Sequence, residues 1–280
     1  MTMKRLAYRR WTDRIARAMA ALAAVFGVVV LGAILLTVVY RGASALGIDF
    51  FTLATAAPRE RGGMANALLG TFYLVVLATL LGVPLGMLCG TYLAEFGREG
   101  PLAVAVRFAC EILMGTPSIL IGVLIYTLLV VPVGGFSGYA GAVALAVIMI
   151  PVVARTTDEM LRLVPHELRE SALALGAPHW KVTLGVVFTA ARSGLVTGAL
   201  LALARTSGET APLLFTALNS TAWPRDLTEP TANLTVTIYN RAMSPFDDWQ
   251  QMAWGASLVI TSAVLGLTVA ARWALGRHCR

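Results

Sequence analysis

The sequence predicts an all-α, polytopic membrane protein with six transmembrane helices. Hydrophobic residues make up 58% of the 280 residues, charged residues make up only 13%, and the mean hydropathy is +0.75. Ordinary soluble domains carry about 25% charged residues. A bilayer core needs about 20 consecutive apolar helical residues, and runs of this kind recur along the whole chain. These observations exclude a water-soluble globular fold.

Apolar windows define six candidate spans, of which the fourth and fifth are the shortest. The spans are roughly Ala18–Tyr40, Ala65–Tyr92, Val104–Val131, Gly138–Val153, Ala190–Leu203 and Met252–Leu275. Residues 1–17 form a basic segment before the first span. The apolar run of residues 18–40 is longer than the about 7–15 residues of a signal peptide. We therefore expect a retained signal anchor rather than cleavage near Ala43-Ser44-Ala45.

The distribution of Lys and Arg predicts the orientation in the membrane. If the six spans alternate in direction, 16 of the 22 basic residues fall on the side of both termini and five fall on the other side. An excess of Lys and Arg marks the cytoplasmic side, so we expect both termini in the cytoplasm. The remaining basic residue, Arg205, lies inside the fifth span.

Two features of the spans predict how the helices pack. Small residues four positions apart let two helix backbones approach closely, and they occur in the second and fifth spans: Gly82, Gly86 and Gly90, and then Gly194 and Gly198. Gly115-Thr116-Pro117-Ser118 interrupts the third span and predicts a kink or a short unwound stretch. The bend either helps the bundle to pack or lines a pathway, and the sequence leaves both alternatives open.

The segment from about 154 to 192 is expected to lie on the cytoplasmic side. Pro165 suits the first turn of a helix, and Gly176 suits its end. Pro178 is expected to open a second helix. This pattern predicts two short helices joined by a tight glycine turn, although an ordinary amphipathic interfacial loop is the alternative.

This segment carries a resemblance to a known family. Glu170-Ser171-Ala172, followed after three residues by Gly176, resembles the "EAA" loop of ABC importer permeases. Ser171 is a small departure from that pattern, and the hydrophobic-Leu-Pro ending of the loop is absent here. The resemblance implies that Glu170, Ser171, Ala172 and Gly176 couple the chain to a separate ATPase.

Further stretches are similar to phosphate-specific ABC importer permeases of the PstA type: Gly115–Ile119, Ala202–Thr216, Met243–Phe246 and Trp249–Trp254. The similarity runs from about residue 65 to the C-terminus, and it implies a type I ABC importer permease domain over 65–275 in a bacterial inner membrane. It also implies several partners: a related permease (PstC type), two ATPase subunits (PstB type), and a periplasmic phosphate-binding protein (PstS type) that faces the outer segment 213–250.

The fifth span offers candidate residues for the substrate pathway. Arg205 and Glu209 are four residues apart and would share one face of a helix, where they can pair. A guanidinium can bind two phosphate oxygens at once, Glu209 can accept the O–H of a protonated phosphate, and Thr210 can add a hydroxyl donor. The alternative is an ion pair that fixes the helix or closes a gate. Gly208 and Pro212 predict a helix break just after the arginine.

No motif predicts catalysis by this chain alone. It has no GxxxxGK[ST] phosphate-binding loop, so ATP and Mg²⁺ are expected on the partner ATPase and no cofactor on this chain. The histidines (166, 179 and 278) have no ligand spacing, and the cysteines (89, 110 and 279) form no CxxC pair, so no metal site or enzyme is predicted. The rival hypotheses are a permease for another oxyanion such as sulfate or molybdate, an ion-coupled secondary transporter, and a membrane scaffold without transport.

Overall fold

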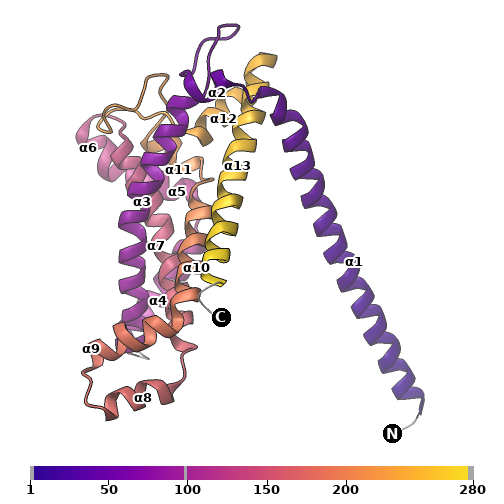
Figure 1. Cartoon of the computed structure of the whole chain (residues 1–280), viewed down its shortest axis with the longest axis vertical. Helices are drawn as coiled ribbons and strands as arrows, with labels where there is room; N and C mark the ends of the chain where they lie inside the picture. Colours follow the sequence, from indigo (N-terminus) through magenta and orange to yellow (C-terminus); the bar gives the residue numbers. More distant parts are fainter. Residues whose placement is uncertain (1–2, 98–99, 277–280) are drawn as a thin grey trace.

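The computed structural model describes residues 3–97 and 100–276, and every regular element in these ranges is a helix. The predicted all-α class is therefore confirmed. His278 and Cys279 lie outside the described residues. Most of the long helices stand side by side in one bundle, whereas the first helix leaves the bundle at an angle (Figure 1).

The long helices are α1 (Met3–Gly42), α3 (Ala65–Thr91), α7 (Gly138–Arg162), α10 (Phe188–Thr206) and α13 (Asp247–Gly276). The shorter helices are α2 (Ile48–Thr52), α4 (Pro101–Gly115), α5 (Ser118–Ile125), α6 (Val131–Val133), α8 (His166–Ala174), α9 (His179–Lys181), α11 (Ala211–Thr216) and α12 (Leu234–Ala242). A 3-10 turn, η1 (Ala43–Ala45), follows α1. Three π-helical segments directly follow α3, α5 and α9: η2 (Tyr92–Gly97), η3 (Tyr126–Val130) and η4 (Val182–Val187).

The number of spans depends on one bent pair of helices. Within the described residues, five helical stretches are long and apolar enough to cross a membrane. A sixth exists if α4 and the helix that starts at Ser118 count as one span, although they are bent by 104°. The bend falls at Thr116 and Pro117, where the backbone is extended. The predicted interruption of the third span is thus confirmed, and Val104–Val131 is not one continuous helix.

Three helices extend beyond the predicted spans. α1 runs without a break from Met3 to Gly42, so the described part of the basic segment 1–17 belongs to the same helix as the first span. α7 starts where the fourth span was predicted to start but continues to Arg162. The helical stretch that contains the fifth span runs from His179 to Thr206, so it begins well before the predicted start and ends slightly after the predicted end. Charged residues ended the apolar windows, but many of them are paired. Arg155 Nε lies 2.9 Å from Glu159 Oε1 one turn further along α7.

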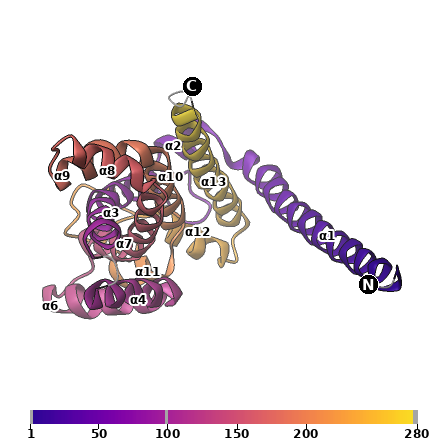
Figure 2. The same cartoon turned by 90° about the horizontal axis from the view of Figure 1, so that it is seen from below.

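The first and last helices have their terminal ends at the same end of the molecule. The start of α1, the end of α13, and α8 and α9 all lie at this end, which we name the α8 end (Figure 1). The opposite end, named the α12 end, holds α2, α6 and α12. Viewed from the α8 end, α3 and α7 lie between α4 on one side and α8 and α9 on the other (Figure 2).

The seam between α3 and α7 holds the bundle together. Gly82, Gly86 and Gly90 face Met149, Val153 and Thr157 of α7, and a Cβ at Gly86 would lie only 2.7 Å from Cβ of Val153. The α10 glycines lie against the same helix in the same way, since Gly194 faces Met160 and Gly198 faces Thr156. The predicted packing role of both glycine series is confirmed.

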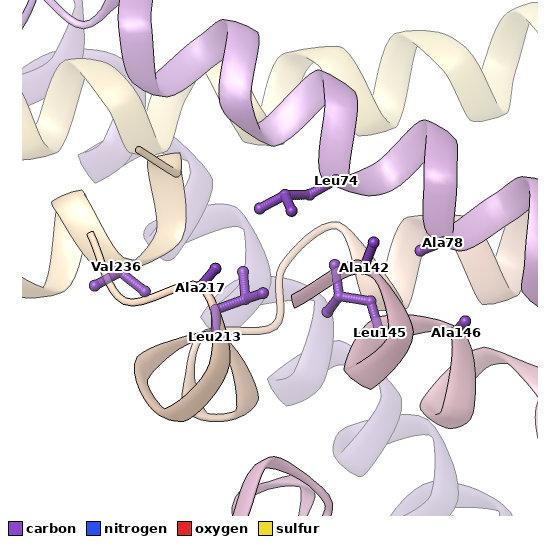
Figure 3. Packing of buried hydrophobic residues seen from close by; sticks show 8 residues of the cluster. All are labelled: Leu74, Ala78, Ala142, Leu145, Ala146, Leu213, Ala217 and Val236. Atoms are coloured by element: carbon purple, nitrogen blue, oxygen red, sulfur yellow. The ribbon is translucent and has the colours of Figure 1, made fainter. Parts of the chain in front are cut away.

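A hydrophobic cluster near the α12 end joins four elements around this seam. It contains Leu74 and Ala78 from α3, and it is completed by Ala142, Leu145, Ala146, Leu213, Ala217 and Val236 from α7, α11 and α12 or next to them (Figure 3). Each of these residues is at most 4% exposed, so α11 and α12 are fixed to the frame that α3 and α7 make.

Within residues 3–97 and 100–276, helix α1 contacts the rest of the molecule only near its C-terminal end. Gly42 lies against Trp254 and Leu258 of α13, and the Arg41 guanidinium stacks 5.3 Å from the centre of the Trp254 ring. The most apolar 18-residue window of α1 is 0% buried. Figure 2 shows the helix projecting away from the bundle.

Gly86→Ala should lower thermal stability. The new methyl group would lie 2.7 Å from Cβ of Val153 and 2.9 Å from the carbonyl oxygen of Ile150, and such overpacking costs about 1–3 kcal/mol. The measurement is the temperature at which half of the detergent-solubilised protein loses its size-exclusion peak. Gly266→Ala is the matched control, since nothing lies within 4 Å of a Cβ there. Equal stability of the two variants would contradict the proposed seam.

Candidate substrate pathway and coupling segment

The fifth span breaks directly after Arg205, as predicted. α10 ends at Thr206 and α11 begins at Ala211. The hydroxyl groups of Thr206 and Ser207 donate to the carbonyl oxygens one turn earlier, at 2.8 and 2.7 Å. Both hydroxyl groups are therefore hydrogen-bonded to the backbone of α10, whereas the Arg205 side chain is exposed.

The expected ion pair between Arg205 and Glu209 is not formed. Among the described residues, no salt bridge within 4.0 Å joins their side chains. A four-residue spacing places two side chains on one face only while the helix continues, and the predicted break ends α10 at Thr206, before the chain reaches Glu209. Glu209 is half-buried, and its backbone carbonyl accepts a hydrogen bond of 2.9 Å from the Thr235 hydroxyl.

Thr210 immediately precedes α11, and its half-buried side chain makes no capping bond there. α11 in turn packs closely against α5. Gly122 of α5 lies so near Pro212 of α11 that a Cβ at Gly122 would be 2.7 Å from Cα of Pro212. The helices that follow two interruptions far apart in the sequence therefore meet in the fold: α5, after the bend that ends α4, and α11, after the break that ends α10. The sequence predicted each break but not this contact.

The coupling segment has the predicted two helices and glycine turn. Pro165 caps α8 in an extended conformation, and Gly176 closes the turn with φ of +80°. The N–H of Gly176 donates to the carbonyl of Leu173 at 2.9 Å. The second helix is not a separate surface helix, however, because α9 continues through η4 into α10. The segment 154–192 is therefore largely helical, and only residues 163–178 connect α7 to α9.

The four residues of the coupling motif occupy different faces of this segment. Glu170 and Ser171 are exposed, and the Ser171 hydroxyl donates to the Glu167 carbonyl at 2.7 Å. Ala172 faces the bundle and packs in a cluster built around Leu161, Val164, Val182, Val187, Ala191 and Leu195. Gly176 is exposed.

Large apolar side chains remain uncovered around α8. Leu168 is 45% exposed, Leu175 is 89% exposed and Trp180 is 58% exposed. Such a patch on a segment that also carries charge is typical of a surface that another protein covers.

Arginines from three elements hold this end of the bundle together, and the sequence did not predict their partners. Arg169 of α8 forms a salt bridge of 2.7 Å with Glu95 of η2. Asp158 of α7 lies between Arg107 of α4, at 2.9 Å, and Arg162, at 2.7 Å. In the sequence analysis these arginines served only to predict the orientation in the membrane. The only available signal was the four-residue spacing of Asp158 and Arg162 on one helix.

A small cavity of about 120 Å³ lies next to the Asp158 cluster. It opens between α4 and α7 and is lined by Leu93, Arg107, Cys110, Glu111, Met114, Arg155, Asp158 and Glu159. Three carboxylates and two guanidinium groups line it, so this mixed lining does not favour an anion.

At the α12 end, two arginines contact side chains of neighbouring segments. Arg61 forms a double hydrogen bond with Asp49, at 2.6 and 3.0 Å, and this bond holds the pKa of the Asp49 carboxyl below its usual value. Arg241 of α12 is 4% exposed and stacks on Trp249 at 5.2 Å. Burial lowers the pKa of the Arg241 guanidinium.

Comparison with known proteins agrees with this architecture. Residues 82–278 match the family described as "Binding-protein-dependent transport system inner membrane component". The chain is 48% identical over 268 residues to the "Phosphate transport system permease protein PstA" of Haemophilus influenzae, covering 96% of this chain and 95% of that protein. It is 47% identical over 270 residues to the protein of the same name from Yersinia pestis, covering 96% and 92%.

Among solved structures, the fold is similar to the MetNI methionine ABC transporter in an inward-facing conformation. The TM-score is 0.54 at 20% sequence identity, over 76% of this chain and 90% of that chain. This likeness supports the type I ABC importer permease fold. From the sequence match and these identities, we conclude that the chain belongs to the family of binding-protein-dependent transport system inner membrane components.

Proposed function

We propose that this chain is the membrane permease subunit of an ATP-driven phosphate importer and forms half of the translocation pathway. The identity of 48% over 96% of the chain to a phosphate transport permease carries this proposal. The chain itself hydrolyses no ATP. The energy enters through α8 from a separate ATPase, and the substrate passes the break between α10 and α11.

The pathway residues are Arg205, Glu209 and Thr210. The Arg205 guanidinium is exposed and makes no salt bridge within the described part of the chain. A guanidinium in a membrane span is costly unless it faces a partner or an aqueous cavity. In the assembled importer it therefore faces the pathway, where its planar fork binds two oxygens of phosphate. Glu209 accepts the O–H of a protonated phosphate, which sulfate does not offer near neutral pH.

The coupling residues Glu170, Ser171, Ala172 and Gly176 present α8 to the ATPase. Leu168, Leu175 and Trp180 surround α8 and supply the apolar part of that interface. On ATP binding, the ATPases close and pull α8, and the bundle then opens the pathway toward the periplasm. Hydrolysis returns the pathway to the inward-facing state.

The proposed partners are those that the resemblance implies, and surfaces that this chain leaves uncovered support them. A related permease of the PstC type packs against the exposed apolar part of α1, residues 18–40, and completes the pathway. Two ATPases of the PstB type bind the α8 ends of the two permeases. A phosphate-binding protein of the PstS type docks at the α12 end, over segment 213–250. This arrangement places the chain in the bacterial inner membrane, with both termini and α8 in the cytoplasm.

The assembly is tested by co-purification from the native membrane through a tag on this chain. An ATPase subunit should be retained, and Leu175→Glu should lower its retention about tenfold or more, because burying a leucine is worth about 1.5–3 kcal/mol. Met243→Glu, also at an exposed position but at the α12 end, is the matched control. An ion-coupled transporter would retain no ATPase in any of these samples.

The substrate assignment is tested by phosphate uptake into proteoliposomes that contain the purified complex. Arg205→Gln and Glu209→Gln should each lower ATP-driven uptake about tenfold or more, since charged hydrogen bonds contribute about 1.5–3 kcal/mol. Arg205→Lys should fall in between, because it keeps the charge but loses the fork.

The control variant for uptake is Arg17→Gln, whose exposed ion pair with Asp13 contributes little. Uptake of sulfate or molybdate in place of phosphate would favour the rival oxyanion permease. A complex that binds the ATPase but moves no anion would favour the scaffold.

A further inference from the structure

A short π-helical segment at the α8 end is held from several directions by charged side chains. This segment, η2 (Tyr92–Gly97), continues α3 and packs against α4 and α7. π-helical turns are rare and frequently lie at functional sites. η2 is therefore a candidate for the place where other elements act on α3.

The first contact comes from α8. Arg169 Nη2 lies 2.7 Å from Glu95 Oε1 and donates at 2.7 Å to the carbonyl oxygen of Leu161, at the end of α7. Its Nη1 donates to the carbonyl oxygen of Val164. The side chains of Arg169 and Glu95 are only 15% and 12% exposed. One guanidinium thus joins α8, the end of α7 and η2.

The second contact comes from α4 and α7 and meets the backbone of η2. The carbonyl oxygen of Leu93 accepts a hydrogen bond of 2.7 Å from Arg107 Nη2 and one of 3.4 Å from Arg162 Nη2. Asp158 bridges these two arginines. Leu93 itself is 1% exposed. η2 is consequently joined to α8 through Glu95 and to α4 through the Leu93 carbonyl.

Opening the Arg169–Glu95 contact is unfavourable, because a largely buried charge would lose its partner. Opening the second contact would remove two guanidinium donors from the Leu93 carbonyl oxygen, on a residue that is 1% exposed. When α8 moves, η2 should therefore move with it, and α4 should follow η2. α4 ends at the 104° bend before α5, and α5 contacts α11 at Pro212, six residues after α10 ends at Thr206. The cavity of about 120 Å³ between α4 and α7 leaves room for α4 to shift.

We propose that η2 is the relay that transmits movement of α8 to α3 and α4, and that Arg169 and Glu95 are its positioning residues. Neither residue touches the substrate in this scheme. The inference rests on the proposed function, because it needs an ATPase that moves α8. It adds to that function the contact between Arg169 and Glu95, which is largely buried and is not part of the exposed surface of α8 that would bind the ATPase.

The test measures phosphate transported per ATP hydrolysed by the complete complex in proteoliposomes. Arg169→Met and Glu95→Met should each lower this ratio roughly tenfold, within the range of about 5- to 150-fold for coupling between sites. ATPase retention and ATP hydrolysis should stay within about twofold of the wild type, since the docking face is unchanged.

The double variant Glu95→Met/Arg169→Met separates a positioning role from a structural one. Replacing both members of a buried ion pair by apolar residues is often neutral for stability, so the yield of complex should recover from any loss in the single variants. The phosphate-to-ATP ratio should remain low. Glu95→Gln, which keeps the size and an acceptor oxygen, should lower the ratio less than Glu95→Met does.

The matched control is Asp13→Met/Arg17→Met, which removes an exposed ion pair of α1 at the same end of the molecule and should leave the ratio unchanged. An unchanged ratio in Arg169→Met or Glu95→Gln would overturn the relay. So would recovery of the ratio in the double variant, which would make the pair merely structural. If the wild-type complex itself moves no phosphate, the proposed function fails instead.

Discussion

Close contact between α3 and α7 is the constraint on which the rest of the molecule depends. In a bilayer the lipid tails are as apolar as the side chains, so helices associate through tight packing rather than through exclusion of water. Glycines on α3 and α10 allow α7 to approach both helices closely. α7 thereby becomes the central element that also contacts α4, α5 and α11, and every candidate functional segment is positioned relative to it.

Around this frame, the elements proposed to function are the interrupted ones. The helices that follow the bend after α4 and the break after α10 meet at Gly122 and Pro212, and the turn after α8 requires the left-handed conformation of Gly176. Backbone groups freed at such breaks must be satisfied by protein or by water in a cavity. Irregular backbone in the middle of a bundle is therefore consistent with a pathway, whereas the tightly packed pair of α3 and α7 provides the surface along which that pathway runs.

The sequence was sufficient for features that depend on composition or on local backbone chemistry. The all-α class, the glycine seams, the break at Pro117 and the turn at Gly176 all follow from properties of single residues or short repeats. It was not sufficient where charges are satisfied by distant partners. Arg155, Asp158 and Glu159 ended the apolar window of α7, and Glu95 carried no visible link to Arg169, 74 residues away. The Arg205–Glu209 pair failed for a related reason, because local spacing holds only while the helix continues.

The π-helical geometry of η2 also sets the direction in which its residues point. A π-helical turn holds one residue more than an α-helical turn, and each residue of an α-helix advances by about 100° around the axis. If the segment returned to α-helical winding with all of its residues, this surplus residue would turn the residues after it by roughly a quarter of a circle relative to α3. A switch between the two windings therefore changes which face of η2 meets α8 without altering any side chain.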